Sequence, residues 1–381
     1  MVEKKLCTGC TACASVCKKE AITMMIDTEG FKYPEIKKSL CINCNLCDKV
    51  CPAEKRIERE KLLEVYCGYT KDKNTLISSS SGGIANHLAK NCLSMGGVVC
   101  GCTMDDDMYG AKHIFITKPD DLNRIKGSKY LQSSLENVFL RIKEYLKNKI
   151  KVLFLGTPCQ VAGLSEYLTT ENISKENLVL VDFICHGVPS PLVWKKYLKE
   201  EEQLHKAKAE TVFFRSKSSG WKNYSLLINF SDGTSFYQPV TENLYLRGFV
   251  SNYYLRPSCY HCNFKNENYY SDITLGDFWS VEKYAPNCDN KSGVSLIITN
   301  SIKGSKILSF LKNEVTYDKI DFANAIKSNP SYSYSVKENY IRKHFFNKLK
   351  RKSVLKLLNK YCSDKFMSKV IRKAVNILGG N

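Results

Sequence analysis

The 381-residue sequence lacks any long apolar run, and it lacks an apolar segment near its first residue. No stretch approaches the roughly 20 apolar residues that a membrane-spanning helix needs, and Cys7 is reached without a signal-type region. We therefore expect a cytoplasmic protein. Disulfides are rare in that compartment, so those of the 18 cysteines that cluster in the sequence are expected to bind metal or to react rather than to form bridges.

Acidic residues are scarce at the C-terminal end, although the whole chain carries a net charge of +19. Residues 341–381 contain one acid, Asp364, and the following basic residues: Arg342, Lys343, Lys348, Lys350, Arg351, Lys352, Lys356, Lys360, Lys365, Lys369, Arg372 and Lys373. Apolar residues alternate with these lysines, namely Phe345, Phe346, Leu349, Val354, Leu357 and Leu358. The pattern predicts a basic amphipathic helix.

Three interpretations of this tail remain open. It either docks on the rest of the protein with its basic face in solvent, or binds loosely to the anionic inner face of a membrane, or receives an acidic electron donor. No recognition motif accompanies the charge, so we expect no specific binding of nucleic acid.

The first 60 residues contain a repeated cysteine motif. Residues 7–17 have the pattern C-x2-C-x2-C-x3-C, and residues 41–51 repeat it with Pro52 following. This is the arrangement of bacterial two-cluster ferredoxins, in which the fourth cysteine of each run ligates the other cluster. The predicted ligands of the first 4Fe-4S cluster are Cys7, Cys10, Cys13 and Cys51. The predicted ligands of the second are Cys41, Cys44, Cys47 and Cys17.

One position departs from the motif: Lys18 stands where the second run has a proline. Proline is no ligand, so we expect only a looser turn. The alternative is zinc binding by some of these thiols, but zinc sites usually use two separated pairs rather than two runs of four. Two adjacent clusters would move single electrons without performing bond chemistry themselves.

The remaining sequence divides into residues 61–150, 151–330 and 331–381. Apolar strands at 151–155 and 177–184 are each followed by a helix, which predicts a buried parallel sheet. Further strands are expected at 98–100, 113–117, 273–275 and 294–299, and helices at 84–95 and 135–149. Segments 224–230 and 234–240 flank an Asp-Gly turn and predict a hairpin. The expected fold is thus an α+β two-cluster ferredoxin-like head, an α/β body with a mostly parallel sheet, a β-rich insert and a helical tail.

A third group of cysteines lies in the body. Cys159 and Cys185 each follow a predicted parallel strand, where ligand sites gather. Cys259 and Cys262 form a C-x2-C pair, so four thiolates could complete another cubane. On the residues alone, buried inert cysteines or half a zinc site are equally good interpretations. The six other cysteines are expected to be core or incidental thiols: Cys67, Cys92, Cys100, Cys102, Cys288 and Cys362.

A glycine-rich turn at Ser81, Gly82 and Gly83 opens the helix expected at 84–95. Such a turn offers free amides and a positive dipole end to a phosphate. Gly127, Ser128, Lys129 and Tyr130 add a cation, a hydroxyl and a ring. On spacing alone, an ordinary loop with an N-capping serine is the better interpretation. No G-x-G-x-x-G follows a strand, which argues against a direct nicotinamide site.

Several segments in order resemble the coenzyme F-420 hydrogenase/dehydrogenase beta-subunit family. They are residues 81–84, 96–99, 127–130 with Ser133, 156–164, 182–190, 256–262 and 271–279. The resemblance implies FAD and a 4Fe-4S cluster in the body, which favours Cys159, Cys185, Cys259 and Cys262 as a third ligand set. It also favours the two glycine-containing segments as flavin contacts, with Ser133 and Thr157 from the matching segments completing the set.

The resemblance implies an FAD-dependent iron–sulfur oxidoreductase. Electrons would enter singly, from a ferredoxin or another redox protein, through the head clusters and the body cluster to FAD, and then reach an organic substrate. Members with such a head and tail resemble bacterial versions found with polysaccharide biosynthesis. The alternatives are an electron-transfer subunit without its own substrate, or a subunit that reduces the deazaflavin coenzyme F-420.

Two further residues, His186 and Asp277, lie in the segments that resemble this family. His186 follows a proposed cluster ligand and could pass a proton to a substrate, although a structural histidine is the better interpretation. Asp277 lies in a Gly-Asp-Phe-Trp turn, where it would cap a helix or bind the flavin rather than act as a catalytic residue.

Overall fold

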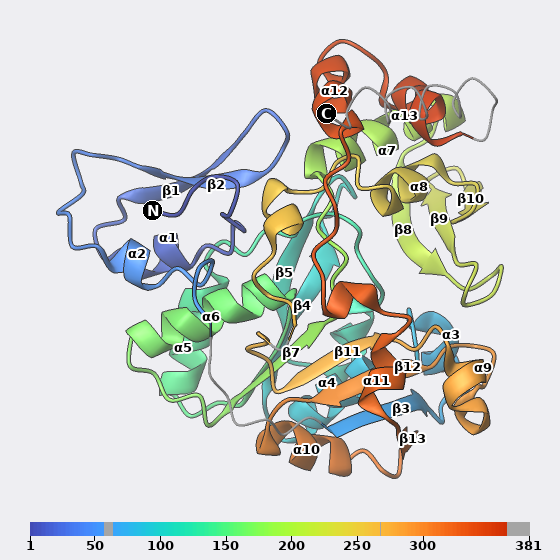
Figure 1. Cartoon of the computed structure of the whole chain (residues 1–381), viewed down its shortest axis with the longest axis horizontal. Helices are drawn as coiled ribbons and strands as arrows, with labels where there is room; N and C mark the ends of the chain where they lie inside the picture. The colour runs from blue at the N-terminus through green and yellow to red at the C-terminus, as the bar shows by residue number, and fades with distance from the viewer. Residues whose placement is uncertain (57–63, 267, 364–381) are drawn as a thin grey trace.

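The computed structural model describes residues 1–56, 64–266 and 268–363 (Figure 1). The cysteine-rich head lies to one side of the body and is built from two short helices and one antiparallel strand pair. Its elements are α1 (Ala12–Val16), β1 (Ile22–Ile26), β2 (Lys32–Ile36) and α2 (Leu46–Lys49). Residues 57–63, at the expected boundary between head and body, lie outside the described residues.

The body contains one eight-stranded sheet in the order β13-β3-β12-β11-β7-β6-β4-β5. Its strands are β3 (Glu64–Thr70), β4 (Val98–Met104), β5 (Ala111–Ile116), β6 (Val152–Leu155), β7 (Leu178–Phe183), β11 (Ile273–Asp277), β12 (Ser295–Thr299) and β13 (Val315–Lys319). The neighbours β11, β7, β6 and β4 run parallel, whereas all other neighbouring pairs are antiparallel. The prediction of a mostly parallel sheet was therefore wrong: the sheet is mixed.

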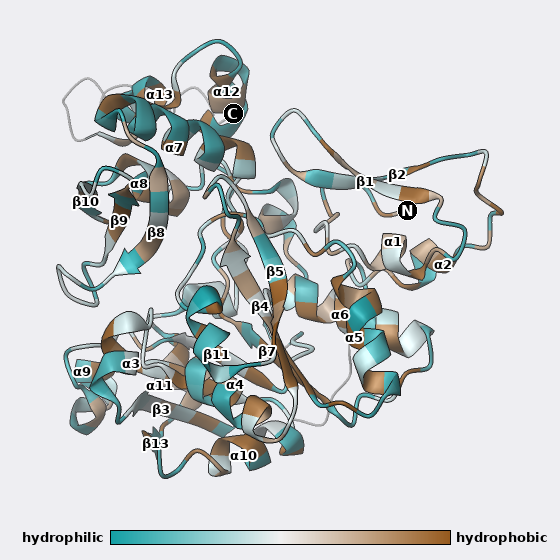
Figure 2. Cartoon of the chain, turned by 180° about the vertical axis from the view of Figure 1, so that it is seen from behind, coloured by the Kyte–Doolittle hydropathy of each residue, from teal (hydrophilic) through white to brown (hydrophobic). Residues whose placement is uncertain are grey.

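Helices cover both faces of this sheet. On one face, α5 (Val138–Lys147) and α6 (Pro158–Thr170) pack on Val152 and Phe154 of β6, and the head packs against the same cluster. On the other face, α4 (Ile84–Ser94) and α10 (Ile302–Ser309) pack on Leu153. Successive side chains of β6 point to opposite faces of the sheet, and both faces are buried. This explains why all residues of this central strand are apolar. Figure 2 shows the central strand β7 in brown, the hydrophobic end of its scale.

The remaining helical elements lie in connections around the sheet. They are α3 (Lys73–Ser78), η1 (Pro119–Ile125), η2 (Pro257–His261), α9 (Val281–Tyr284), η3 (Pro286–Cys288), α11 (Phe322–Ile326) and η4 (Pro330–Tyr332). Side chains of α9, η3, α11 and η4 share a core with alternate residues of β3 and β12.

A second, three-stranded sheet forms a separate lobe with the tail (Figure 1). The expected hairpin is confirmed as β9 (Ser225–Phe230) and β10 (Ser235–Pro239), and β8 (Ala209–Ser216) pairs with β9. The lobe also contains α7 (Pro191–His205), α8 (Leu244–Val250), α12 (Ile341–Leu349) and α13 (Val354–Cys362).

The described part of the tail docks on this lobe. The six apolar residues that predicted its amphipathic face are buried in the shared core with α7 and α8. They cannot lie in a membrane at the same time, so the structure favours the docked interpretation for residues 341–363. The basic residues from Lys365 to Lys373 lie outside the described part of the chain. None of the described helices is long and apolar enough to span a bilayer.

Candidate functional site

The first predicted ligand set of the head lies around one small cavity. Cys7, Cys10, Cys13 and Cys51 all line this cavity of about 210 Å³, together with Cys47 from the second set. Burial, together with the nearby Cys7, Cys51 and Cys47, raises the pKa of the Cys13 thiol to about 12. Thiols gathered in this way repel one another once ionised, so a metal centre is needed to hold them as thiolates.

The two cysteine runs share an unusual backbone conformation. Gly9 and Thr11 have φ angles of 69° and 68°, and the equivalent Asn43 and Asn45 have 55° and 57°. A β-branched residue such as Thr11 rarely adopts a positive φ, so this conformation costs free energy that the surroundings must offset. Both loops therefore wind in the same way around the space that their cysteines face. Of the second set, Cys41 and Cys44 lie before α2, Cys47 within it, and Cys17 at the end of α1.

The structure brings the four body cysteines together. Cys159 lies in the first turn of α6 and Cys185 follows β7, at the carboxyl ends of adjacent parallel strands. Cys259 lies in η2, and Cys262 ends it. Burial, with smaller effects from Cys159 and Cys262, raises the pKa of Cys185 to about 12. The other three cysteines also raise the pKa of Cys259, so the four thiols lie near one another. The positions of the strand ends predicted this only for Cys159 and Cys185.

The local surroundings of these thiols favour their ionised form once a metal is bound. Thr157 caps α6 in a capping box with Gln160, and its Oγ1 lies 3.2 Å from Cys159 Sγ. The amide of Val188 donates to Cys259 Sγ at 3.3 Å. Hydrogen bonds to sulfur and a helix N-terminus both stabilise thiolate charge.

One helical turn separates the head cysteines from the body cysteines. Gly163 of α6 is so close to the head that a Cβ atom there would lie 2.8 Å from both Cβ and Sγ of Cys10. Cys159 precedes Gly163 by four residues, a rise of about 6 Å along a helix. Cys10 of the first head set therefore packs against α6 one turn beyond Cys159 of the body set.

We expect substitution of Gly163 to separate these two sets. Gly163→Ala should displace Cys10 slightly and Gly163→Leu strongly, because the contact is already closer than a Cβ tolerates. Helix propensity alone would make Gly163→Ala stabilising by about 1 kcal/mol. Iron per chain should fall by up to roughly four atoms in Gly163→Leu, measured on anaerobically purified protein. Full iron content in both variants would contradict this arrangement.

A larger cavity of about 620 Å³ lies next to the body cysteines. Its wall includes Cys185 and its neighbours, the loop before α4, and the carboxyl ends of β6, β7 and β11. The volume falls in the range of cofactor sites. Of the residues predicted to contact a flavin, the cavity is lined by Ser81, Gly83, Gly127, Ser128, Lys129, Tyr130, Ser133 and Thr157.

Gly82 is the one predicted contact that does not line the cavity. Its amide donates to Ser295 Oγ at 3.0 Å, and its carbonyl accepts from the Thr70 amide at 2.7 Å. Gly82 therefore fixes the loop to β3 and β12. Gly83, with a φ of 83°, is the N-cap residue of α4, whose first amides receive no side-chain cap. Those amides are thus available to an anion at the cavity wall.

Sequence reasoning missed Arg215, a cation in the same cavity. Its side chain is 5% exposed, and Nη1 donates to Asp277 Oδ2 at 2.6 Å. The guanidinium carbon lies 4.5 Å from the centre of the Tyr224 ring. Nε and Nη2 are buried without a hydrogen-bond partner among the described residues. Arg215 belongs to β8 of the insert, so only the tertiary fold brings it here.

His113 is a second residue that the sequence did not reveal. Its Nε2 lies 3.0 Å from the Leu155 carbonyl, so Nε2 is the donor and Nδ1 is left with a lone pair. Burial lowers the His113 pKa to about 4, which keeps the ring neutral. Nδ1 and the hydroxyl of Ser328, which lines the same cavity, have no partner within the described part of the chain. A buried group without a partner is costly, so these atoms favour a polar ligand.

His186 and Asp277 both line this cavity. His186 Nε2 lies 2.7 Å from Asn252 Oδ1, and burial lowers the His186 pKa. Its bond to Asn252 fits the structural interpretation. Asp277 does not cap a helix: it pairs with Arg215, and Ser280 is the N-cap residue of α9. The expectation of a cap was wrong because β8 supplies a cation that the local sequence does not show.

Comparisons with known proteins give three matches to family models along the chain. Residues 6–55 match the model of a 4Fe-4S dicluster domain. Residues 65–139 and 150–322 match the N-terminal and C-terminal models of the coenzyme F420 hydrogenase/dehydrogenase beta subunit. A chain of the F420-reducing [NiFe] hydrogenase complex from Methanosarcina barkeri is 18% identical, with a TM-score of 0.48, over 80% of this chain and 95% of that chain. No curated protein gives a match.

Proposed function

Because the chain belongs to the coenzyme F420 hydrogenase/dehydrogenase beta-subunit family and carries a 4Fe-4S dicluster head, we propose that it is an FAD-dependent iron–sulfur oxidoreductase. It takes single electrons from a redox protein such as a ferredoxin and reduces an organic substrate. The observation that supports this most strongly is that three sites lie next to one another in the fold. Head cysteines, body cysteines and a cofactor-sized cavity adjoin one another through α6 and Cys185.

The residues of the body fit the two groups that the family implies. Four facing thiols suit a third 4Fe-4S cluster, held by Cys159, Cys185, Cys259 and Cys262. The cavity offers uncapped amides of α4, cations and polar atoms without partners, which suit the phosphates and ring of FAD. Clusters supply one-electron transfer, and a flavin links it to two-electron chemistry.

The chain's own residues would bind and orient these groups. Arg215 is held between Asp277 and the Tyr224 ring, so its partnerless Nε and Nη2 have fixed positions in the wall of the cavity. His113 stays neutral and offers an acceptor, whereas Lys129 offers a positive charge. The aromatic and aliphatic parts of the wall exclude water, which strengthens each of these interactions.

Lys129 makes FAD binding depend on pH. Burial lowers its pKa to about 8, so the ammonium is charged below that pH and is lost as the pH rises through it. The affinity for FAD should therefore weaken above about pH 8, and Lys129→Met should lower it about tenfold at pH 7 and flatten the profile. Quenching of flavin fluorescence measures both effects, with the exposed Lys118→Met as control. A pH profile in Lys129→Met equal to that of the native protein would show that Lys129 does not face the cofactor.

The proposal as a whole is tested by an anaerobic transfer experiment. Reduced ferredoxin is mixed with the FAD-loaded protein, and loss of the oxidised flavin absorption is followed. We expect complete reduction through the protein. Reduction of the head clusters with the flavin left oxidised would overturn the scheme.

The two alternatives are distinguished by the electron acceptor. An F420-reducing subunit would turn over with coenzyme F420 as the added acceptor, and a pure electron-transfer subunit would reduce no small molecule without a partner protein. The role in polysaccharide biosynthesis and the peripheral contact with a membrane stay predictions. Genes adjacent to this one test the first, and sedimentation with anionic vesicles tests the second.

A further inference from the structure

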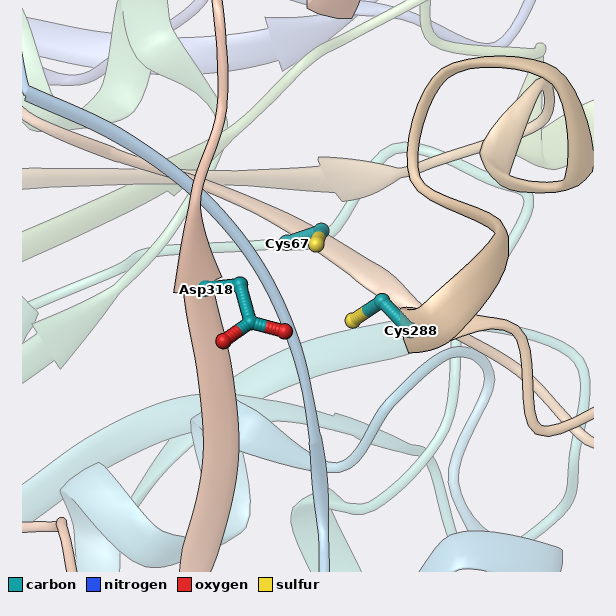
Figure 3. A group of neighbouring side chains, drawn as sticks. All are labelled: Cys67, Cys288 and Asp318. Atoms are coloured by element: carbon teal, nitrogen blue, oxygen red, sulfur yellow. The ribbon is translucent and has the colours of Figure 1, made fainter.

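Two cysteines that the sequence left as core thiols lie together far from the cluster sites. Cys67 belongs to β3, and Cys288 ends η3. Their Sγ atoms and a carboxylate oxygen of Asp318 all lie within 4.8 Å of one another, and Figure 3 shows the three side chains pointing toward a common space. Among the described residues, this is the only such group of histidine, cysteine and acidic side chains.

The sheet register fixes two of the three side chains. Cys67 of β3 is directly opposite Asp318 of β13, so both project from the same face of the antiparallel pair. Cys288 approaches that face from η3, which covers the core beneath β3 and β12. The three donors therefore come from three elements that are distant in sequence.

The burial of the group favours an ion rather than an incidental cluster. Cys67 and Cys288 are 0% and 1% exposed, whereas Asp318 is exposed. The neighbouring Lys319 pairs with Glu64 rather than with Asp318, and the Asp318 carboxylate faces the two thiols. A cation would offset this concentration of negative charge, and the open side at Asp318 gives it an access path and room for a water ligand.

We propose that Cys67, Cys288 and Asp318 bind a zinc ion. Two sulfur donors and one carboxylate are ligands that zinc accepts, whereas calcium and magnesium prefer oxygen alone. Two thiolates on a tetrahedral zinc lie about 3.8 Å apart, so small side-chain movements suffice to close the site. The fourth position is taken by water at the exposed side.

The ion would have a structural role at the edge of the main sheet. Among the described strands, β13 is hydrogen-bonded only to β3. Zinc would join β13, β3 and η3. It would also restrain Cys67 and thereby the adjacent Gly68, and the loop at Gly82 packs on Gly68. This proposal does not depend on FAD or on the assignment of the iron–sulfur ligands.

Zinc binding by the anaerobically purified holoprotein tests the proposal. Zn²⁺ is titrated by calorimetry into the native protein and into Cys67→Ser, Cys288→Ser and the exposed Asp318→Asn, all with equal iron content. We expect one zinc site per chain in the native protein, no such site in the cysteine variants, and affinity lowered at least about tenfold in Asp318→Asn. Cys92→Ser, another buried cysteine, is the control and should bind zinc normally.

Two results would overturn the proposal. One is equal zinc binding by the native protein, Cys67→Ser and Asp318→Asn. The other is a Cys67–Cys288 disulfide in anaerobically purified protein, found by mass spectrometry together with no uptake of zinc. X-ray absorption at the zinc edge gives an independent check, because the native site should show two sulfur neighbours. Asp318→Asn keeps the experiment decisive if a cysteine variant does not fold.

Discussion

Cys185→Ser is expected to remove the body cluster while leaving the head clusters intact. Iron should fall from about twelve to about eight atoms per chain, because one of three cubanes loses a ligand. Transfer of electrons from the reduced head to bound FAD should slow by at least roughly 100-fold, since Cys185 lies between the body thiols and the cavity. Iron analysis and stopped-flow absorption measure the two effects.

The control for this experiment is Cys92→Ser. Cys92 is buried in α4, and its Sγ lies 3.6 Å from the Val98 carbonyl, an interaction that a serine hydroxyl can replace. It should keep full iron content and native transfer rates. A Cys185→Ser protein with the iron content and rates of the control would remove Cys185 from the proposed route.

The second large effect is expected at Arg256, which joins the head to the body. This fully buried residue begins the segment that carries Cys259, and its side chain enters the head. Nε donates to the Cys7 carbonyl at 2.8 Å, Nη2 to the Lys32 carbonyl at 2.9 Å, and the guanidinium lies 4.2 Å from the Tyr33 ring centre. One side chain thus contacts the first head set and adjoins the body set.

Arg256→Gln should leave these head carbonyls without donors and should remove a buried positive charge next to Cys7. We expect the free energy of unfolding to fall by roughly 3 kcal/mol. The reduction potential of the adjacent head cluster should become more negative, because a cation stabilises the reduced form. Denaturant unfolding and a redox titration followed by paramagnetic resonance measure the two quantities.

Two variants separate charge from packing at this position. Arg256→Lys keeps the charge but loses the fork of donors. The reduction potential of the head cluster should therefore stay near the native value, whereas the free energy of unfolding should still fall. Arg124→Gln removes an exposed arginine from η1 and should change neither quantity. An unchanged potential in Arg256→Gln would mean that the guanidinium does not act on a cluster.

The sequence revealed those parts of the site that depend on neighbouring residues. The cysteine runs of the head are local, so their spacing alone indicates the ligand type, and the positive φ angles shared by Thr11 and Asn45 follow the repeat. Cys159 and Cys185 could be placed together because parallel strands end at one edge of a sheet. The loop at Gly83 could be placed because glycine and serine mark a helix start.

The parts that were missed depend on long-range pairing. β3 and β13 are separated by more than two hundred residues. Their antiparallel pairing is one of four that make the sheet mixed, and its register brings Cys67 to Asp318. Arg215 reaches the cavity only because the insert folds back over the body. No spacing rule connects such residues, because their proximity is set by the packing of whole elements rather than by a local turn.

Counting the cofactors of anaerobically prepared protein tests the central claim most directly. We expect about twelve iron atoms, about twelve sulfide ions and one FAD per chain, with paramagnetic signals from interacting clusters upon reduction. A preparation with about eight iron atoms, in which the four body thiols all react with an alkylating reagent after unfolding, would contradict the third cluster. A preparation without iron or flavin would contradict the whole account.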